Sequence, residues 1–270
     1  MTTINNISPM ATIQAMNKHS SKESKLLNQL SSGKKINKGS DDVIGMAKAK
    51  QLEKAVRSLD AADRNITNAS NKLDTAVGGL SATLEQLQGL RELAVKGADS
   101  TLSLSERRSV KDQANAAMQE VDRLAQNIKF DAQALLDGSQ DNKEVMVGEN
   151  AGDNKTIRLK NASVDGLQIR DVDVSSADNA SASLESLDAA IREVSTRISQ
   201  AGSQSESFMQ AASNNKERSS NLSQARSVTE DLDYALALGE LKATQIKKES
   251  STQTLSALLQ NNKNGVTKLF

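Results

Sequence analysis

His19 is the single histidine of the chain, and the chain contains no cysteine. Zinc, haem and iron–sulfur centres take their ligands mainly from histidine and cysteine, so no such centre is expected. A nucleophilic triad would also depend on His19, which lies in a Ser- and Lys-rich stretch without a catalytic motif. We therefore expect no catalytic residue, no metal ligand and no cofactor, and the chain is not expected to be an enzyme.

The composition favours long helices over a compact globule. The 270 residues are 37% hydrophobic and 25% charged, but they include only one Tyr, three Phe, one Pro and no Trp. Aromatic side chains normally fill much of a globular core, whereas an aliphatic chain with almost no proline suits helices that meet along narrow seams. The many Leu, Ile, Val and Ala residues argue equally against disorder.

The formal charges cancel, but they are unevenly distributed. Residues 1–40 carry six Lys and one Glu, residues 131–193 carry 13 acidic and 6 basic residues, and residues 241–270 carry five Lys and one Glu. The basic residues are spaced and lack aromatic neighbours, so we expect no nucleic-acid partner. No apolar run is long enough to cross a membrane, and the first ten residues lack the pattern of a secretory signal.

A heptad repeat over residues 52–94 is the strongest structural signal. One row consists of large aliphatic residues seven apart, which are the expected core of a rod: Leu52, Leu59, Ile66, Leu73, Leu80 and Leu87. A second row, three residues further on, is mostly alanine from Ala55 to Ala76. This pattern predicts a helix over 42–98 that packs closely against a neighbour. Such a helix would be roughly 80 Å long, so an elongated molecule is expected.

Other periodic stretches predict further helices. Ser103-Leu-Ser-Glu106 has the form of a capping box and opens a predicted helix over 104–129. A stripe of aliphatic residues predicts a helix over 183–230, preceded by a short Ser/Asp/Ala linker. A last stripe from Tyr234 to Leu269 has polar residues at several seam positions, so this helix needs partners.

The segment between the second and third helices predicts a small β region. Alternating runs around 144–160 indicate a β-hairpin, and residues 164–174 indicate a further extended piece. The predicted fold is mainly α. It is an elongated antiparallel coiled coil or helical bundle with paired terminal helices and one small β-hairpin region.

An ordered set of short motifs resembles bacterial flagellins. Leu30-Ser-Ser-Gly-Lys-Lys-Ile-Asn37 and Asp41-Asp-Val-Ile-Gly-Met-Ala47 are followed by Leu87-Gln-Gly-Leu-Arg-Glu-Leu-Ala-Val95. Leu135-Leu-Asp-Gly138 and Asp231-Leu-Asp-Tyr-Ala235 continue the same order. Each motif is weak alone, but the set covers essentially the whole chain. The chain is similar to a minimal flagellin without the variable outer domains of longer members.

The resemblance implies a structural subunit that polymerises into the flagellar filament for motility. Residues 1–39 and 234–270 would form the inner tube and residues 40–233 a rod-like outer-tube domain. Gly33, Asn37 and Gly39 would lie in the connection between them. Apolar residues of the terminal segments would be buried between subunits and so drive assembly: Ile7, Leu27, Leu30, Leu241, Leu255, Leu258, Leu259, Val266, Leu269 and Phe270.

The resemblance also implies a location and partners. The protein would leave the cell unfolded through the flagellar type III apparatus, without a cleaved signal peptide, and would be extracellular. Its partners would be other copies of itself and other flagellins, a flagellar export chaperone, and the hook-associated and cap proteins. The filament would have a relatively basic interior and an acidic outer surface.

One departure from the family pattern concerns an innate Toll-like receptor. In many flagellins this receptor reads the pattern Gln-Arg-x-Arg-Glu-Leu-Ala-Val, and the corresponding residues here are Gln88, Gly89, Arg91, Glu92 and Leu93. Gly89 replaces the first Arg of the pattern and removes a charged bidentate donor. The resemblance therefore implies a weak or absent receptor contact, and the alternative is that the segment serves only the core and subunit contacts.

Two other functions stay open from the sequence. A hook–filament junction protein shares its terminal helices with flagellins, although the match over Leu87–Val95 and at the hairpin favours a flagellin. A secreted coiled-coil effector or adhesin belongs to another class and would be a stable monomer with ordered ends.

Overall fold

The computed structural model describes residues 9–267, with side chains described for residues 9–260. The chain forms two compact units: residues 9–54 with 221–267, called here the terminal unit, and residues 55–220, called the central unit.

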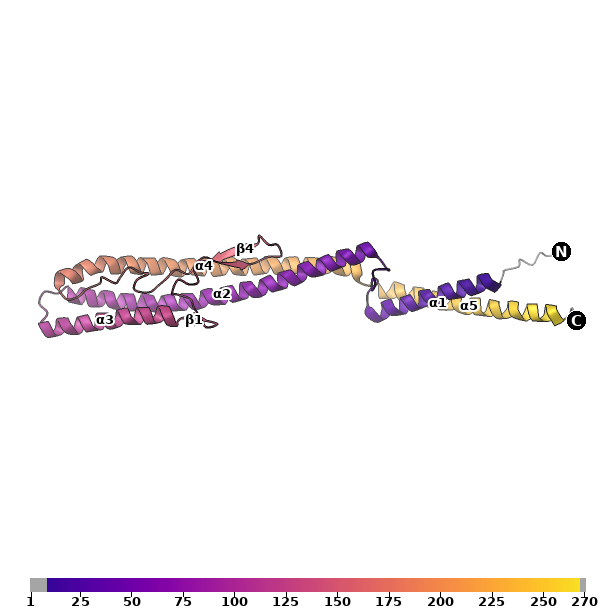
Figure 1. Ribbon diagram of the computed structural model, residues 1–270, viewed down its shortest axis with the longest axis horizontal. Helices are drawn as coiled ribbons and strands as arrows, with labels where there is room; N and C mark the ends of the chain where they lie inside the picture. The colour runs from indigo at the N-terminus through magenta and orange to yellow at the C-terminus, as the bar shows by residue number, and fades with distance from the viewer. Residues whose placement is uncertain (1–8, 268–270) are drawn as a thin grey trace. The chain divides into compact units, whose positions relative to one another are not determined.

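Five helices contain most of the described residues (Figure 1): α1 Pro9–Ser32, α2 Val43–Gly97, α3 Leu104–Asn127, α4 Ala177–Glu230 and α5 Tyr234–Thr267. Two short antiparallel strand pairs lie between α3 and α4: β1 Lys129–Phe130 with β2 Gln133–Ala134, and β3 Lys143–Met146 with β4 Asn154–Ile157. The mainly α fold with paired terminal helices and a small hairpin region is confirmed. The boundary between the two units falls inside α2 and inside α4.

The heptad rows of α2 form the core of the central unit. Leu59, Ile66, Leu73, Leu80 and Leu87 are each at most 2% exposed. The alanines three residues further on are buried as well, and they let neighbouring elements approach closely. The same core takes Val110 and Val121 from α3, and Leu187, Val194 and Phe208 from α4. Leu52, the first residue of the large row, lies in the terminal unit and is half-buried.

The capping box that opens α3 is present in full. Ser103 Oγ accepts the backbone N–H of Glu106, and Glu106 Oε2 accepts the backbone N–H of Ser103 at 2.9 Å. Two of the free backbone N–H groups at the helix start are satisfied in this way. The helix ends at Asn127, just before the predicted 129, because the chain enters β1 at Lys129.

Two predictions about the segment before α4 are corrected by the structure. No strand is present within 164–174, although Val164, Leu167, Ile169, Val172 and Val174 are all buried there. The alternating apolar residues of 164–174 are therefore buried in an irregular segment and do not form a strand. The predicted linker is partly helical, because α4 starts at Ala177 instead of 183. Ser176 caps it, with Oγ accepting the N–H of Asn179 at 3.1 Å.

The hairpin is held on α4 by polar contacts. Lys155 Nζ donates to the carbonyl of Ser207 at 2.7 Å and lies 5.9 Å from the centre of the Phe208 ring. Asn215, which is 4% exposed, donates from Nδ2 to the Val147 carbonyl at 2.8 Å. These bonds give hydrogen-bond partners to the backbone carbonyls of Ser207 and Val147 and to the buried amide of Asn215. They place β4 and the residue that follows β3 beside α4.

Candidate assembly surface

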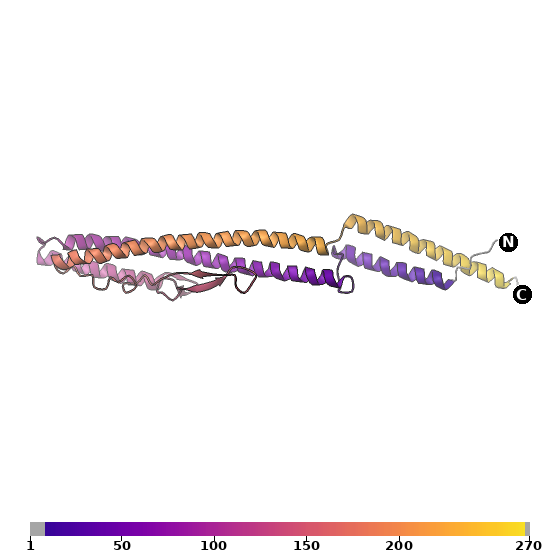
Figure 2. The same ribbon diagram turned by 90° about the horizontal axis from the view of Figure 1, so that it is seen from above.

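α1 and α5 run side by side in the terminal unit (Figures 1 and 2). The apolar interior between them is small, with Leu26 of α1 and Ala237 and Leu241 of α5 each at most 7% exposed. Thr12 and Thr244 are also buried on this pair. Burial of only a few medium-sized side chains gives limited stabilisation, because the hydrophobic effect scales with the apolar area removed from water.

Charged and polar contacts fix the register of this helix pair. Glu23 accepts from Lys248 Nζ at 2.7 Å and from Gln245 Nε2 at 3.4 Å, and these bonds hold the pKa of Glu23 below its ordinary value. Lys22 pairs with Glu240 at 3.0 Å. Gln245 and Lys248, two polar positions of the α5 seam, therefore share a partner in α1 of the same chain.

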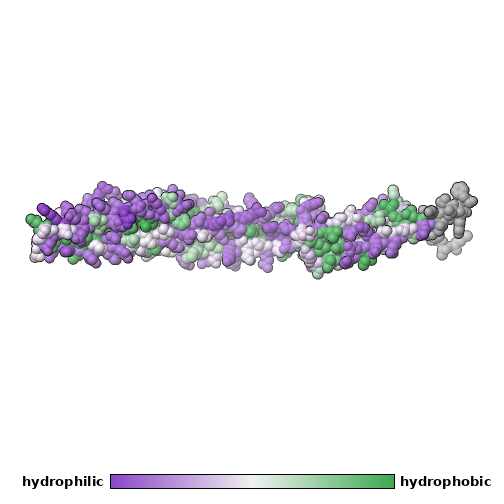
Figure 3. Space-filling model, turned by 90° about the horizontal axis from the view of Figure 1, so that it is seen from below, coloured by the Kyte–Doolittle hydropathy of each residue, from purple (hydrophilic) through white to green (hydrophobic). Residues whose placement is uncertain are grey.

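Large apolar side chains remain exposed on the same helix pair. Among the described residues these are Met10, Ile13, Leu27, Tyr234, Leu236, Leu238, Ile246 and Leu259. Leu236 is 63% exposed and Ile246 is 66% exposed, so neither side chain belongs to the interior of the α1–α5 pair. Figure 3 shows green, apolar surface on this pair, next to the grey residues. Several large apolar side chains exposed on the same elements are a common feature of interaction surfaces.

The predicted assembly residues with described side chains are of three kinds: exposed, buried and half-buried. Leu27 and Leu259 are about half exposed, at 49% and 55%, whereas Leu241 is buried inside the α1–α5 pair. Leu30, Leu255 and Leu258 are half-buried. Ile7, Leu269, Phe270 and the side chain of Val266 lie outside the described residues.

Sequence reasoning missed several exposed residues, among them Met10, Leu236 and Ile246. The stripe predicted from the sequence begins at Tyr234, which is exposed, whereas the structure buries Ala237 and Thr244 on the inner side of α5. A single helix with apolar residues on two faces gives no periodic signal that distinguishes the inner face from the outer one. The partner helix determines which face is buried.

The residues predicted for the connection lie in the terminal unit, where the α1–α2 link pairs with the α4–α5 link. Lys34 and Asp231 form an antiparallel bridge, Lys35 N–H donates to the Glu230 carbonyl at 2.8 Å, and Leu232 N–H donates to the Gly33 carbonyl at 3.0 Å. Gly33 has φ of 72°, a conformation in which glycine avoids the strain of a side chain.

The other two connection residues differ in their contacts. Asn37 donates its backbone N–H to Asp41 Oδ2 at 3.1 Å and its side-chain amide to the Lys34 carbonyl at 3.1 Å. A Cβ on Gly39 would have no atom within 4 Å. Asn37 is therefore tied into the link, and Gly39 lies in open space.

Glu230 anchors the paired links. Its side chain accepts from Lys34 Nζ at 2.7 Å and from Arg226 Nε at 2.9 Å, and the residue is 8% exposed. Burial acts to raise the pKa of Glu230, but the hydrogen bonds and charges of Lys34 and Arg226 outweigh burial and lower it. The carboxylate is charged, and each of its two oxygens accepts a hydrogen bond from a side chain of the same chain.

The receptor-like segment lies on the surface of α2 in the central unit. Gln88, Gly89, Arg91 and Glu92 are exposed, and Leu93 is half-buried. Arg91 Nε donates to Asp188 Oδ1 of α4 at 2.6 Å, which raises the pKa of Arg91 and lowers that of Asp188. A Cβ on Gly89 would have no atom within 4 Å, so this position is open.

The described residues contain no group of three or more side chains suited to hold a metal ion. No helix within the described part of the chain is long and apolar enough to cross a membrane.

The fold is that of a helical structural subunit, and its terminal helices carry exposed apolar side chains. Residues 4–141 match the bacterial flagellin N-terminal helical region, and residues 184–270 match the bacterial flagellin C-terminal helical region. The chain therefore belongs to the bacterial flagellin family, and it is a subunit of the flagellar filament. The filament that flagellins form lies outside the cell.

Several relatives match over most of their length. A flagellin of Halalkalibacterium halodurans is 28% identical, with 86% of each chain covered. A flagellin of Bacillus subtilis is 26% identical, with 96% of each chain covered. A flagellar filament 30.7 kDa core protein of Treponema maltophilum is 25% identical, with 85% of this chain and 86% of the relative covered.

Two solved structures share the helical fold. A crystal structure of Bacillus cereus flagellin has a TM-score of 0.51 at 21% identity, covering 56% of this chain and 88% of that one. The structure of a putative flagellar hook-associated protein from Vibrio parahaemolyticus has a TM-score of 0.53 at 14% identity, covering 70% of this chain and 99% of that one. The family matches favour a flagellin over a hook–filament junction protein.

Proposed function

We propose that the exposed apolar side chains of α1 and α5 are the surface through which one copy packs against others in the filament. The observation that carries this proposal is the contrast within one helix pair. Leu26 and Leu241 are already buried inside the pair, whereas Leu236 and Ile246 remain more than half exposed. Burying the exposed set between copies would add apolar area to a pair that has little of its own.

On this proposal the terminal segments, residues 1–39 and 234–270, form the inner tube. Residues 40–233 form the outer tube, and Gly33, Asn37 and Gly39 lie in the connection. Ile7, Val266, Leu269 and Phe270 would extend the apolar surface beyond the described side chains. The uneven charges, basic at both ends and acidic over 131–193, support a basic inner tube and an acidic outer face.

The proposed partners follow from family membership and from this surface. Before assembly, an exported subunit must keep its apolar terminal segments from associating, which is the task proposed for an export chaperone. Cap and hook-associated proteins would meet the same terminal helices at the two ends of the filament. A contact with the innate Toll-like receptor would be weak, because Gly89 offers no side chain and Arg91 is already paired with Asp188.

Seeded elongation of the purified chain tests the proposal. Leu236→Lys together with Ile246→Lys should prevent growth on filament seeds, because two charges would be buried at each contact between copies. Leu104→Lys together with Met209→Lys is the matched control, since these central-unit side chains are also exposed, at 79% and 52%. Normal elongation of the first variant, seen by electron microscopy, would contradict the proposal.

A further inference from the structure

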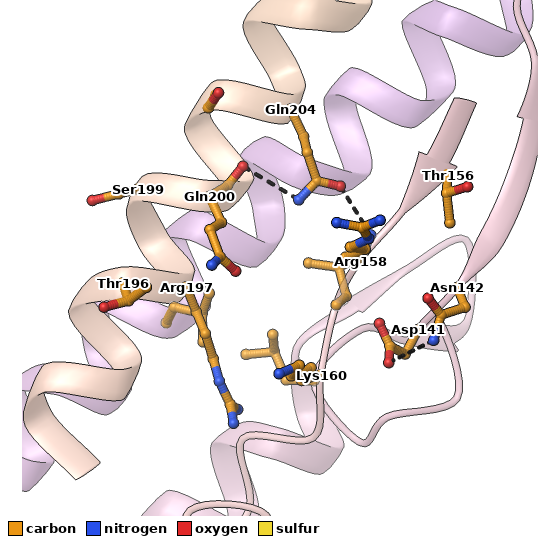
Figure 4. Close-up of a pocket in the computed structure, with 14 residues that line it drawn as sticks. Asp141, Asn142, Thr156, Arg158, Lys160, Thr196, Arg197, Ser199, Gln200 and Gln204 are labelled. Atoms are coloured by element: carbon orange, nitrogen blue, oxygen red, sulfur yellow. Dashed lines mark hydrogen bonds between the residues drawn. The ribbon is translucent and has the colours of Figure 1, made fainter. Parts of the chain in front are cut away.

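A polar hollow of about 760 Å³ lies in the central unit, between α4 and the segment after β4. Its floor is apolar and consists of Leu80, Leu136 and Leu159, which are at most 3% exposed. Residues from Thr196 to Gln204 of α4 form one wall, and Arg158 and Lys160 stand on the opposite wall (Figure 4).

Two cations face this hollow without an ionic partner in the described part of the chain. Leu159 is buried while Arg158 and Lys160 on either side of it are exposed, as expected where alternate residues of an extended segment point the same way. The neighbouring Arg197, by contrast, is used internally: it pairs with Glu193 at 2.9 Å and donates to the Asn161 carbonyl at 2.7 Å.

The position of Arg158 is fixed from the α4 side. Its backbone N–H donates to Gln204 Oε1 at 2.9 Å, and Gln204 in turn donates from Nε2 to the Gln200 carbonyl at 3.2 Å (Figure 4). The acid at the rim, Asp141, accepts a hydrogen bond from Asn142 at 3.0 Å. The hollow therefore offers two positive side chains, with hydroxyl and amide groups around them and an apolar floor.

This surface suits a protein contact better than a small molecule. Small-molecule sites are mostly apolar with few polar groups, whereas the walls of this hollow are lined largely by charged, hydroxyl and amide side chains. Polar rims around a small apolar centre are characteristic of protein–protein interfaces. The unpaired cations select an acidic partner.

A second copy of this chain can supply that partner, an argument that rests on the proposed filament function. Growth of an open helical polymer uses heterologous contacts, in which one surface meets a different surface of the next copy. The central unit carries two exposed acidic pairs on helix faces, Glu85 with Glu92 on α2 and Asp178 with Glu185 on α4. Members of each pair are seven residues apart, two helical turns, so they lie on one face.

We infer that the hollow receives an acidic helix face of a neighbouring copy, with Arg158 and Lys160 as the cations that fix its register. Opposite charges across such a contact set partner choice and register, and like charges placed there are strongly unfavourable. The contact is separate from the apolar surface of α1 and α5, which lies in the other unit.

Charge reversal tests this inference in the full-length chain. Arg158→Glu with Lys160→Glu should raise the concentration needed for seeded elongation at least about tenfold. The matched control is Arg108→Glu with Lys129→Glu, which changes the charge of the same unit equally at exposed positions, and it should change that concentration less than about twofold. Unchanged elongation of the first variant, or an equal loss in both, would overturn the inference.

A cross-linking measurement does not depend on the folding of the charge-reversed variant. Because the chain has no cysteine, Ser199→Cys gives one labelling position on the α4 wall for a photoreactive maleimide. Irradiated filaments should yield a cross-link to a second copy at a peptide that contains one of the two acidic pairs. Cross-links only within one chain, or only to other peptides, would overturn the inference.

The two proposals fail in different ways. If the unchanged chain does not elongate on seeds, the proposed assembly function fails. If it elongates and the charge-reversed variant elongates equally well, only the role of the hollow fails.

Discussion

Two adjacent glycines of α2 offer a sharp test of the packing in the central unit. A Cβ placed on Gly78 would have no atom within 4 Å, whereas a Cβ on Gly79 would lie 2.8 Å and 2.9 Å from the two Cγ atoms of Ile128 and 2.9 Å from Leu136 Cδ1. Both residues are in the helix interior, so replacement by alanine has the same local effect on the helix in each case. The difference between the two variants reports only the space at Gly79.

The two substitutions should change the free energy of unfolding in opposite directions. Alanine is about 1 kcal/mol more favourable than glycine inside a helix, so Gly78→Ala should raise the free energy of unfolding by up to that amount. At Gly79 the added methyl group must displace Ile128, whose branched side chain is stiff, and Leu136, which is fully buried. Such overpacking costs about 1–3 kcal/mol. Because the helix gain of about 1 kcal/mol offsets part of this cost, we expect Gly79→Ala to lower the free energy of unfolding by up to about 2 kcal/mol.

Urea unfolding followed by circular dichroism measures both variants against the unchanged chain. The midpoint of the central-unit transition should rise for Gly78→Ala and fall for Gly79→Ala, without a change in slope. If both variants shift in the same direction by the same amount, the close approach of Ile128 and Leu136 to α2 is wrong.

Further predictions concern the two units. Glu230→Gln should destabilise the terminal unit by about 1–2 kcal/mol at neutral pH; because the folded pKa lies below the ordinary 4.5, the difference from the unchanged chain should vanish as pH falls through that pKa. The fluorescence of Tyr234, the single tyrosine, follows this unit, and a difference that persists at low pH would count against the ion pair. Leu241→Ala should lower the free energy of opening of the α1–α5 pair by about 2 kcal/mol or more, and Leu238→Ala should change it by less than about 0.5 kcal/mol. Hydrogen exchange measures this opening, and equal effects of the two substitutions would refute the assigned seam. Gly89→Arg should increase activation in a Toll-like receptor reporter assay, and unchanged potency would show that position 89 does not limit recognition.

The helices and the central core were predictable because their signals are local. Large residues seven apart, from Leu59 to Leu87, can be buried together only on one face of a helix, and the capping box at Ser103 defines a helix start by its own side chains. The start of α4 was misplaced because Ser, Asp and Ala residues suit both linkers and helix starts. Ser176 acts as a cap, which the composition of the stretch does not reveal.

The surface was less predictable because burial depends on partners distant in sequence. Leu241 and Ile246 are both apolar residues of α5, and only the packing of α1 decides that the first is buried and the second exposed. The links that contain Lys34 and Asp231 pair although nearly two hundred residues separate them in sequence, and no short motif predicts this pairing. The hollow beside Arg158 likewise exists only because the chain after β4 lies along α4.

A filament reconstruction by electron cryomicroscopy would test the central claim most directly. The filament should be assembled from the full-length chain and solved at a resolution that shows side chains. We expect Leu236, Ile246 and Leu259 to be buried against other copies, with residues 131–193 on the outer side of the filament. A map in which this apolar surface faces solvent, or in which residues 131–193 line the channel, would contradict it.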